Sequence, residues 1–200
     1  MFLKINQNTN RWITIATVSY IVLLTSLLFI QISQIRIEPI LYNVFTLLLG
    51  PLYILLIVYL IEILITFREK PSLSAAFTMY VCLEVITFID KLFGGRLMGS
   101  LLTTTSGIMI SVVIIYLFIL TLGIKNQYIA IPYKLFGFSL LIFVLSIYFI
   151  TLVFPMVANR RTMNYLQLIS LLTPISILLI LNGVSKFIKE ENIKMQEGNG

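Results

Sequence analysis

The sequence predicts an all-α, polytopic integral membrane protein: a bundle of six transmembrane helices joined by short loops. Hydrophobic residues make up 59% of the 200 residues and charged residues only 11%, whereas a soluble domain usually carries about 25% charged residues. The mean hydropathy is +1.03, and six apolar runs are each long enough to cross a hydrocarbon core of about 30 Å. One core of this size could not enclose so much apolar surface, so the lipid bilayer is its expected solvent.

The six runs define one expected transmembrane domain that covers residues 1–200. Trp12 begins the first helix as an interfacial anchor. That run is longer than the apolar core of a signal peptide, and no A-x-A-like cleavage pattern follows it. Pro51 and Pro174 predict kinks in the second and sixth helices, because proline removes a backbone donor and clashes one turn back. The expected helices are 12–32, 40–66, 72–93, 98–124, 133–157 and 165–184, followed by a polar tail, 185–200, that frays beyond its first turns.

The distribution of basic residues predicts the orientation. Six spans place both termini on the same side, and nine of the fourteen Lys and Arg residues lie in the segments on that side. Cytoplasmic segments of membrane proteins carry the excess of Lys and Arg. We therefore expect both termini in the cytoplasm. The usage of isoleucine, asparagine and lysine would suit an AT-rich genome, so we expect a bacterial protein of the cell inner membrane.

Several classes of function are disfavoured by composition. The net charge of +6 does not indicate nucleic-acid binding, because the basic residues are spread between the apolar runs. The chain has no histidine, which removes Ser-His and Cys-His nucleophile pairs. Cys82 is the only cysteine, so no intrachain disulfide can form. Neither a phosphate-binding loop nor a metalloprotease motif is present. We expect no catalytic residue, no cofactor and no metal, and we do not expect an enzyme.

The third run carries the sharpest functional signal. At helical spacing Tyr80, Glu84, Thr87 and Lys91 fall on one stripe. A carboxyl group deep in hydrocarbon costs roughly 2.5–3.5 kcal/mol, so this stripe must face protein or water. Glu84 is therefore a candidate proton- or cation-binding group, with Tyr80 and Thr87 in the same polar interior. The alternative is a structural carboxyl that hydrogen-bonds Tyr80, Thr87 or another helix.

Glu62 is a further candidate for the polar interior, although its depth differs. At 1.5 Å per residue, Glu62 and Glu84 lie roughly 12 Å apart along the bilayer normal. They could line one pathway at two levels, but we do not expect them to share a proton. We favour an interfacial Glu62 that faces Arg68 or Lys70, because charges near helix ends cost little to place. Lys91 is expected to snorkel outward or to pair with another helix.

The fourth run carries a ladder of small residues spaced four apart. Such a ladder lets a neighbouring helix approach closely. The neighbour is either another helix of the bundle or the same helix in a homodimer. The ladder residues are Gly95, Gly99, Thr103, Gly107 and Ser111.

Three functional hypotheses follow. The leading one is a non-enzymatic small transporter, or the membrane subunit of a larger complex, with its polar interior around Glu84. The second is a membrane-embedded sensory or signalling module that acts through a separate cytoplasmic partner. The third is a scaffold or immunity-type protein that binds another membrane protein. The sequence does not identify the ion or small molecule that would be bound.

Overall fold

The computed structural model describes residues 5–33, 35, 38–93, 99–153 and 165–197, and of residues 39–40, 99–104, 153 and 194–197 the backbone alone. Within these ranges the chain is all-helical and has no strand, and it contains six helices long and apolar enough to cross a membrane. The expected fold class is confirmed to this extent. The elements are α1 (Gln7–Ile32), α2 (Pro39–Thr66), α3 (Pro71–Leu92), α4 (Gly99–Leu122), α5 (Ala130–Val153), a short 3₁₀ helix η1 (Gln167–Leu171) and α7 (Leu172–Glu197).

Local sequence explains where the first helices begin. The helix α1 starts five residues before Trp12, because the side chain of Asn6 accepts a hydrogen bond of 2.7 Å from the backbone of Thr9 and caps the first turn. Pro39 and Pro71 occupy the first positions of α2 and α3. A missing N–H costs nothing there, since the first-turn donors have no partner within the helix.

The end of α2 is a Schellman turn. The N–H of Arg68 donates to the carbonyl of Ile65, and the N–H of Glu69 donates to the carbonyl of Leu64. Arg68 has a φ of 54°, which is the left-handed position that glycine usually occupies in this motif. The turn delivers the chain directly into α3 and keeps the loop between the two helices very short.

The sixth span differs from the expectation at both ends. Pro174 disrupts α-helical bonding toward its N-terminal side, so η1 precedes a helix that begins at Leu172. At the other end the chain continues as helix through Glu197, which is further than the first turns of the tail that were expected to be helical. Phe187 explains the continuation, because its ring packs against Phe67 and Tyr128, at centroid distances of 4.7 and 5.5 Å.

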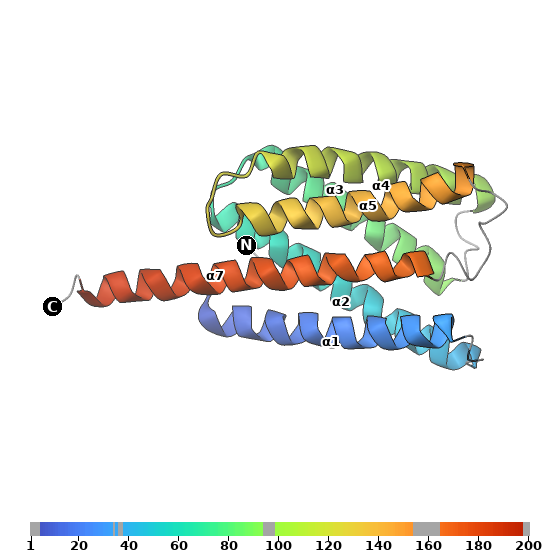
Figure 1. The fold of residues 1–200 in the computed structure, drawn as a ribbon, viewed down its shortest axis with the longest axis horizontal. Helices are drawn as coiled ribbons and strands as arrows, with labels where there is room; N and C mark the ends of the chain where they lie inside the picture. The colour runs from blue at the N-terminus through green and yellow to red at the C-terminus, as the bar shows by residue number, and fades with distance from the viewer. Residues whose placement is uncertain (1–4, 34, 36–37, 94–98, 154–164, 198–200) are drawn as a thin grey trace.

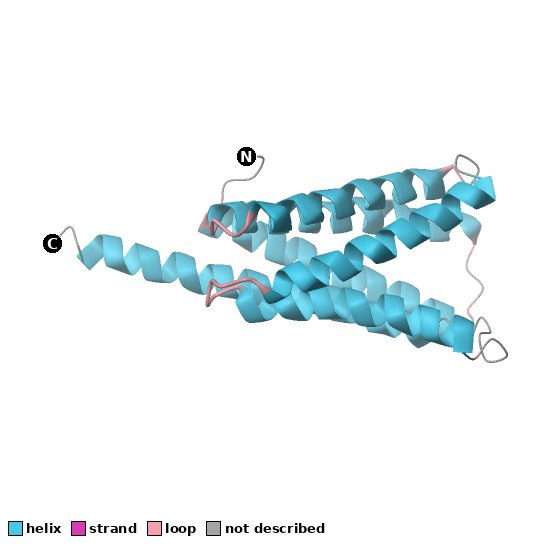
Figure 2. Cartoon of the chain, turned by 90° about the horizontal axis from the view of Figure 1, so that it is seen from above, coloured by secondary structure: helices cyan, strands magenta, loops and turns pink. Residues whose placement is uncertain are grey.

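The six helices form a closed ring. Each helix contacts the next one along the chain, and α7 returns to contact α1. Both termini lie at one end of the bundle, and α7 extends well past the other helices on that side (Figure 1). We call this end, which also carries the α2–α3 and α4–α5 turns, the closed end. Toward the opposite end, the open end, the helices separate (Figure 2).

The closed end holds the core. Its largest fully buried side chains come from the second half of α2 and the first halves of α3 and α5, and they include Tyr59, Phe77, Tyr133 and Phe136. Phe77 stacks on Phe136 at 5.6 Å. The hydroxyl of Tyr133 donates to the carbonyl of Leu60 at 2.7 Å and so ties α5 to α2. Burial of these rings, at about 25 cal/mol per Å² of apolar area, is the main force that closes this end.

Buried Asn10 joins three helices at the closed end. Its side-chain nitrogen donates to the carbonyl of Leu181 on α7 at 3.0 Å, and its side-chain oxygen accepts from the hydroxyl of Tyr59 on α2 at 3.3 Å. A buried amide without these partners would cost about 1–3 kcal/mol. Asn10 thus fixes how α1 meets its neighbours.

The outer surface of the ring is apolar. Large hydrophobic side chains are exposed along the length of every helix, among them Phe29, Met79, Val112, Ile119, Phe138 and Leu152. Such a surface is far larger than the apolar patches of soluble monomers. Together with the span lengths, it indicates a membrane-embedded protein.

A polar cavity at the open end

A cavity of about 390 Å³ lies inside the ring and is lined by residues from all six spans. Its volume is within the range of small-molecule sites in proteins. Polar groups reach it from α2 at Thr46 and from the sixth span at Ser170 and Thr173. Because the core fills the closed end, the cavity occupies the other half of the bundle.

The stripe on α3 forms one wall of this cavity. Tyr80, Glu84, Thr87 and Lys91 all line it, and Phe77, one turn earlier, enters the closed core. The structure therefore brings three of the predicted polar residues to one place. The hydroxyl of Thr87 donates to the carbonyl of Glu84 at 2.9 Å, so it satisfies its own helix as well as facing the cavity.

A chain of tyrosines links Glu84 to two other helices. The hydroxyl of Tyr80 lies beside the Glu84 carboxyl, one turn along α3, and is hydrogen-bonded at 2.9 Å to the hydroxyl of Tyr53 on α2. The ring of Tyr53 stacks on that of Tyr20 from α1 at 5.6 Å and meets Tyr80 edge-on at 6.5 Å. The carboxyl thus lies beside a wall of three phenol rings rather than beside lipid.

Gly50 explains how α2 approaches α3 beside the cavity. A Cβ atom built at Gly50 would lie 2.3 Å from ring carbons of Phe88, so any larger residue there would force that ring to move. The next residue, Pro51, lies inside α2 without ending it. The contact brings the cavity-facing side of α2, with Tyr53, alongside the carboxyl on α3.

Lys91 also belongs to the cavity. It is exposed, lines the same wall and acts on Glu84 through its charge rather than through a hydrogen bond. It lies seven residues further along α3, about 10 Å nearer the open end. The expectation that Lys91 snorkels outward or pairs with another helix stays a prediction, and its place on the cavity wall was not expected.

Glu62 lies elsewhere. Its side chain is 4% exposed and belongs to the closed end of α2, and it does not line the cavity that Glu84 lines. The expectation of an interfacial residue facing the headgroups is corrected by this burial. The α2 face that carries Glu62 turns inward because Tyr59 and Ile63, its neighbours along that helix, are core residues.

The ladder on α4 is only partly described. Gly95 lies outside the described residues, and for Gly99 and Thr103 only the helical backbone is described. Gly107 is exposed, and a Cβ built there would meet nothing within 4 Å. Ser111 contacts α5, where its hydroxyl lies 3.1 Å from that of Tyr148. At Gly107 the ladder does not serve packing within the chain, and a homodimer stays a prediction.

Sequence reasoning missed Tyr20 and Tyr53, which complete the site. Each is a phenol deep within an apolar run, and a hydroxyl at that depth needs a polar partner. The depth of these two hydroxyls was therefore the available signal. Which residues they would meet depends on the order of the six helices around the ring, and that order cannot be predicted from any single segment.

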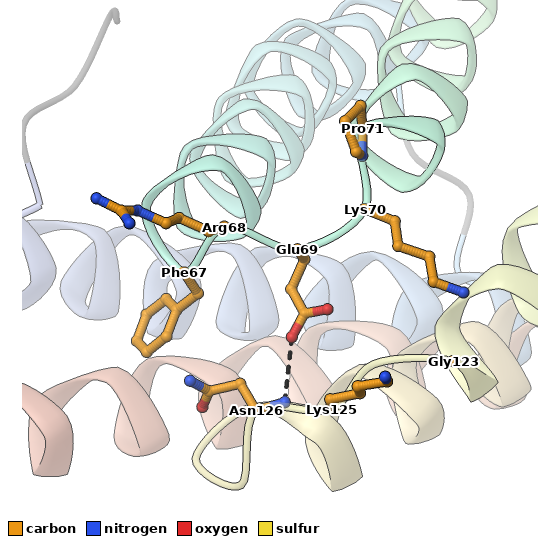
Figure 3. Close-up of a pocket in the computed structure, with 8 residues that line it drawn as sticks. All are labelled: Phe67, Arg68, Glu69, Lys70, Pro71, Gly123, Lys125 and Asn126. Atoms are coloured by element: carbon orange, nitrogen blue, oxygen red, sulfur yellow. Dashed lines mark hydrogen bonds between the residues drawn. The ribbon is translucent and has the colours of Figure 1, made fainter.

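A second depression lies on the surface of the closed end, between the α2–α3 and α4–α5 turns (Figure 3). Its volume is about 590 Å³. The Glu69 carboxylate accepts a hydrogen bond of 3.1 Å from the backbone N–H of Asn126 and joins the two turns. Lys70 and Lys125 extend to one side of this bond, and Arg68 extends away from them. The depression is shallow and basic, as expected of loops beside lipid headgroups.

Among the described residues, no three His, Cys, Asp or Glu side chains gather where they could hold a metal ion. In the part of the chain that the structure describes, the fold is a bundle of six helices that are long and apolar enough to span a membrane, with a polar cavity inside it. Comparison of the chain with protein-family models, with curated proteins and with solved structures gave no match.

Proposed function

We propose that this chain is a non-enzymatic small transporter, or the membrane subunit of a larger transport complex, and that its ligand binds in the cavity beside Glu84. The observation that supports the proposal most is the cavity itself, which draws residues from all six spans. A bundle that needed only to be stable would gain from filling this space, since empty volume costs dispersion and hydrophobic energy. The carboxyl of Glu84 on the cavity wall also supports this function, because ionisable groups within a membrane are usually functional.

The expected orientation of the chain in the membrane determines the side to which the cavity opens. With both termini in the cytoplasm of a bacterial cell, as the basic residues favour, the closed end faces the cytoplasm and the cavity opens outward. Ligand would enter from outside, and release inward would require the closed-end core to separate. Alternating closure of two ends around a central site is the general way in which such bundles move solutes.

A solute-depletion experiment tests the transport proposal. Cells that express the chain are compared with control cells for removal of small molecules from a defined medium. Glu84→Gln should abolish the difference while the protein remains in the membrane at normal level. Glu191→Gln is the matched control, because Glu191 is an exposed carboxyl on α7 far from the cavity, and it should behave as wild type. Identical depletion by wild type and Glu84→Gln would contradict the proposal.

A signalling module is the second candidate, and one observation favours it. A single helix, α7, runs from the cavity residue Thr173 to Glu197, past the end of the bundle. A rigid helix transmits displacement along its axis. Ligand in the cavity could therefore move the extension, which is the part of α7 that lies past the end of the bundle. Under this hypothesis a separate cytoplasmic partner detects the position of the extension, and no solute crosses the membrane.

A further inference from the structure

The cavity combines one carboxyl with an unusual density of aromatic rings. Tyr20, Tyr53 and Tyr80 surround the Glu84 side of the space, and Phe88 and Phe143 also line it. The rings come from α1, α2, α3 and α5, so no single helix explains their presence together. Aromatic rings add bulk and would be a poor choice for a lining that serves only to pass water.

Such a lining has a specific electrostatic property. The face of an aromatic ring carries partial negative charge and attracts a cation within about 6 Å of its centre, and the attraction grows when water is excluded. The rings of Tyr53 and Tyr20 are nearly parallel, with 24° between their planes, whereas Tyr80 lies at 87° to Tyr53. Two ring orientations therefore meet beside the cavity. The Glu84 carboxyl, on the same wall as Tyr80, supplies a negative charge when it is ionised, and a cation bound beside it favours that ionised form.

The donor set distinguishes organic cations from metal ions. Calcium prefers six to eight oxygen ligands, and magnesium demands a near-octahedral set. The cavity wall offers a single carboxyl at Glu84, and the described residues contain no acidic cluster of metal-binding type. A substituted ammonium group is weakly hydrated and is satisfied by one carboxylate and several ring faces.

Lys91 limits the charge of the ligand. It carries the other charge among the described lining residues and lies about 10 Å nearer the open end than Glu84. A second positive charge on a ligand seated at Glu84 would approach this ammonium in a space of low dielectric, where like charges repel strongly. A ligand with one cationic group and a neutral remainder avoids that repulsion.

We propose that the cavity binds a small organic monocation, a substituted ammonium compound whose charged group sits between Glu84 and the rings of Tyr20, Tyr53 and Tyr80. This proposal rests on the proposed function in one respect, namely that the cavity is the binding site. The proposal adds the chemical class of the ligand. The ring faces hold the alkyl groups of the ammonium, and the carboxylate neutralises its charge.

Binding to the purified full chain tests the proposal directly. The probes are tetramethylammonium, choline and benzyltrimethylammonium chlorides, with thermal stability of the detergent-solubilised protein as readout and sodium chloride at equal ionic strength as reference. The neutral isostere of choline, 3,3-dimethylbutan-1-ol, controls for shape, and glycine betaine controls for net charge. At least one cation should raise the unfolding midpoint in a saturable way, and the neutral and zwitterionic controls should not.

Variants assign the effect to the cavity. Glu84→Gln should weaken the binding of the stabilising cation at least about tenfold. Tyr53→Phe keeps the ring and should change the affinity less than about threefold, whereas Tyr53→Leu removes the ring and should weaken it about tenfold. The Phe and Leu variants form a pair that separates the ring from the hydroxyl. Glu191→Gln should bind as wild type does.

The outcomes separate this proposal from the transport proposal. Stabilisation by the neutral isostere or by betaine equal to that by choline, or no stabilisation by any of the cations, would overturn the assignment of ligand class. Equal affinity of the Tyr53 Phe and Leu variants would overturn the role of the rings. In either case the transport proposal would still be supported if solute depletion depended on Glu84. Cation binding without any depletion would instead retain the ligand class and remove transport.

Discussion

Single residues at the closed end set how closely its parts can pack. Gly183 on α7 lies against the α4–α5 turn, and a Cβ built there would be 2.1 Å from the carbonyl oxygen of Tyr128. Gly137 on α5 is similar, with Thr121 of α4 at 2.5 Å. By contrast Gly107, in the predicted ladder, faces open space. The helical spacing of small residues marked α4, but the tightest contacts of α5 and α7 are made by isolated glycines.

These glycines give a paired stability prediction. Gly183→Ala should destabilise the protein by about 1–3 kcal/mol, because the new methyl group would collide with backbone that cannot rotate away. Gly107→Ala should leave stability unchanged or raise it by up to about 1 kcal/mol, through the better helix propensity of alanine. Denaturation midpoints of the purified variants check both. A Gly183→Ala protein as stable as wild type would show that the turn does not rest on α7 in this way.

At the scale of the elements, the number of helices and their apolar character follow from composition and run length. The expected starts of the second and third helices, at 40 and 72, lie one residue from the observed starts at Pro39 and Pro71, because the effect of proline on a helix start is local. The kink expected at Pro51 stays a prediction. The extension of α7 past the bundle could not be predicted in this way. Most of its residues are polar, and contacts with other elements hold its first part: Phe187 meets Phe67 and Tyr128, and Ile188 packs against the core. The hydroxyl of Tyr128 also donates to Glu190, which raises the pKa of that phenol.

The extension offers a test between the two candidate functions. Removal of residues 192–200 keeps Phe187 and Glu190, so the contacts with Tyr128 remain and the fold should be unchanged. A transporter should then deplete the same solutes as the full chain. A signalling module should keep its ligand affinity and lose the response of its cytoplasmic partner. Loss of solute depletion in a folded truncated protein would contradict the assignment of transport to the bundle alone.

At the scale of the whole molecule, the site depends on the closed ring of six helices. The sequence placed Tyr80, Glu84 and Thr87 on one face of one helix, because that face is a matter of helical period. It could not supply Tyr20 or Tyr53, because their meeting with Tyr80 depends on how α1 and α2 turn about their axes. It also misplaced Glu62, since closeness to a helix end did not reveal that the closed end is filled with core.

The central claim is that water reaches the inside of the ring while lipid covers its outside. Cysteine accessibility in intact cells tests it most directly, using Cys82→Ala as background and a membrane-impermeant methanethiosulfonate reagent, which reacts only with hydrated thiolates. Thr87→Cys, in the cavity, should be labelled from outside. Met79→Cys, 53% exposed but on the lipid face, should not react, nor should Thr121→Cys in the closed end. Labelling of Met79→Cys with protection of Thr87→Cys would contradict the account.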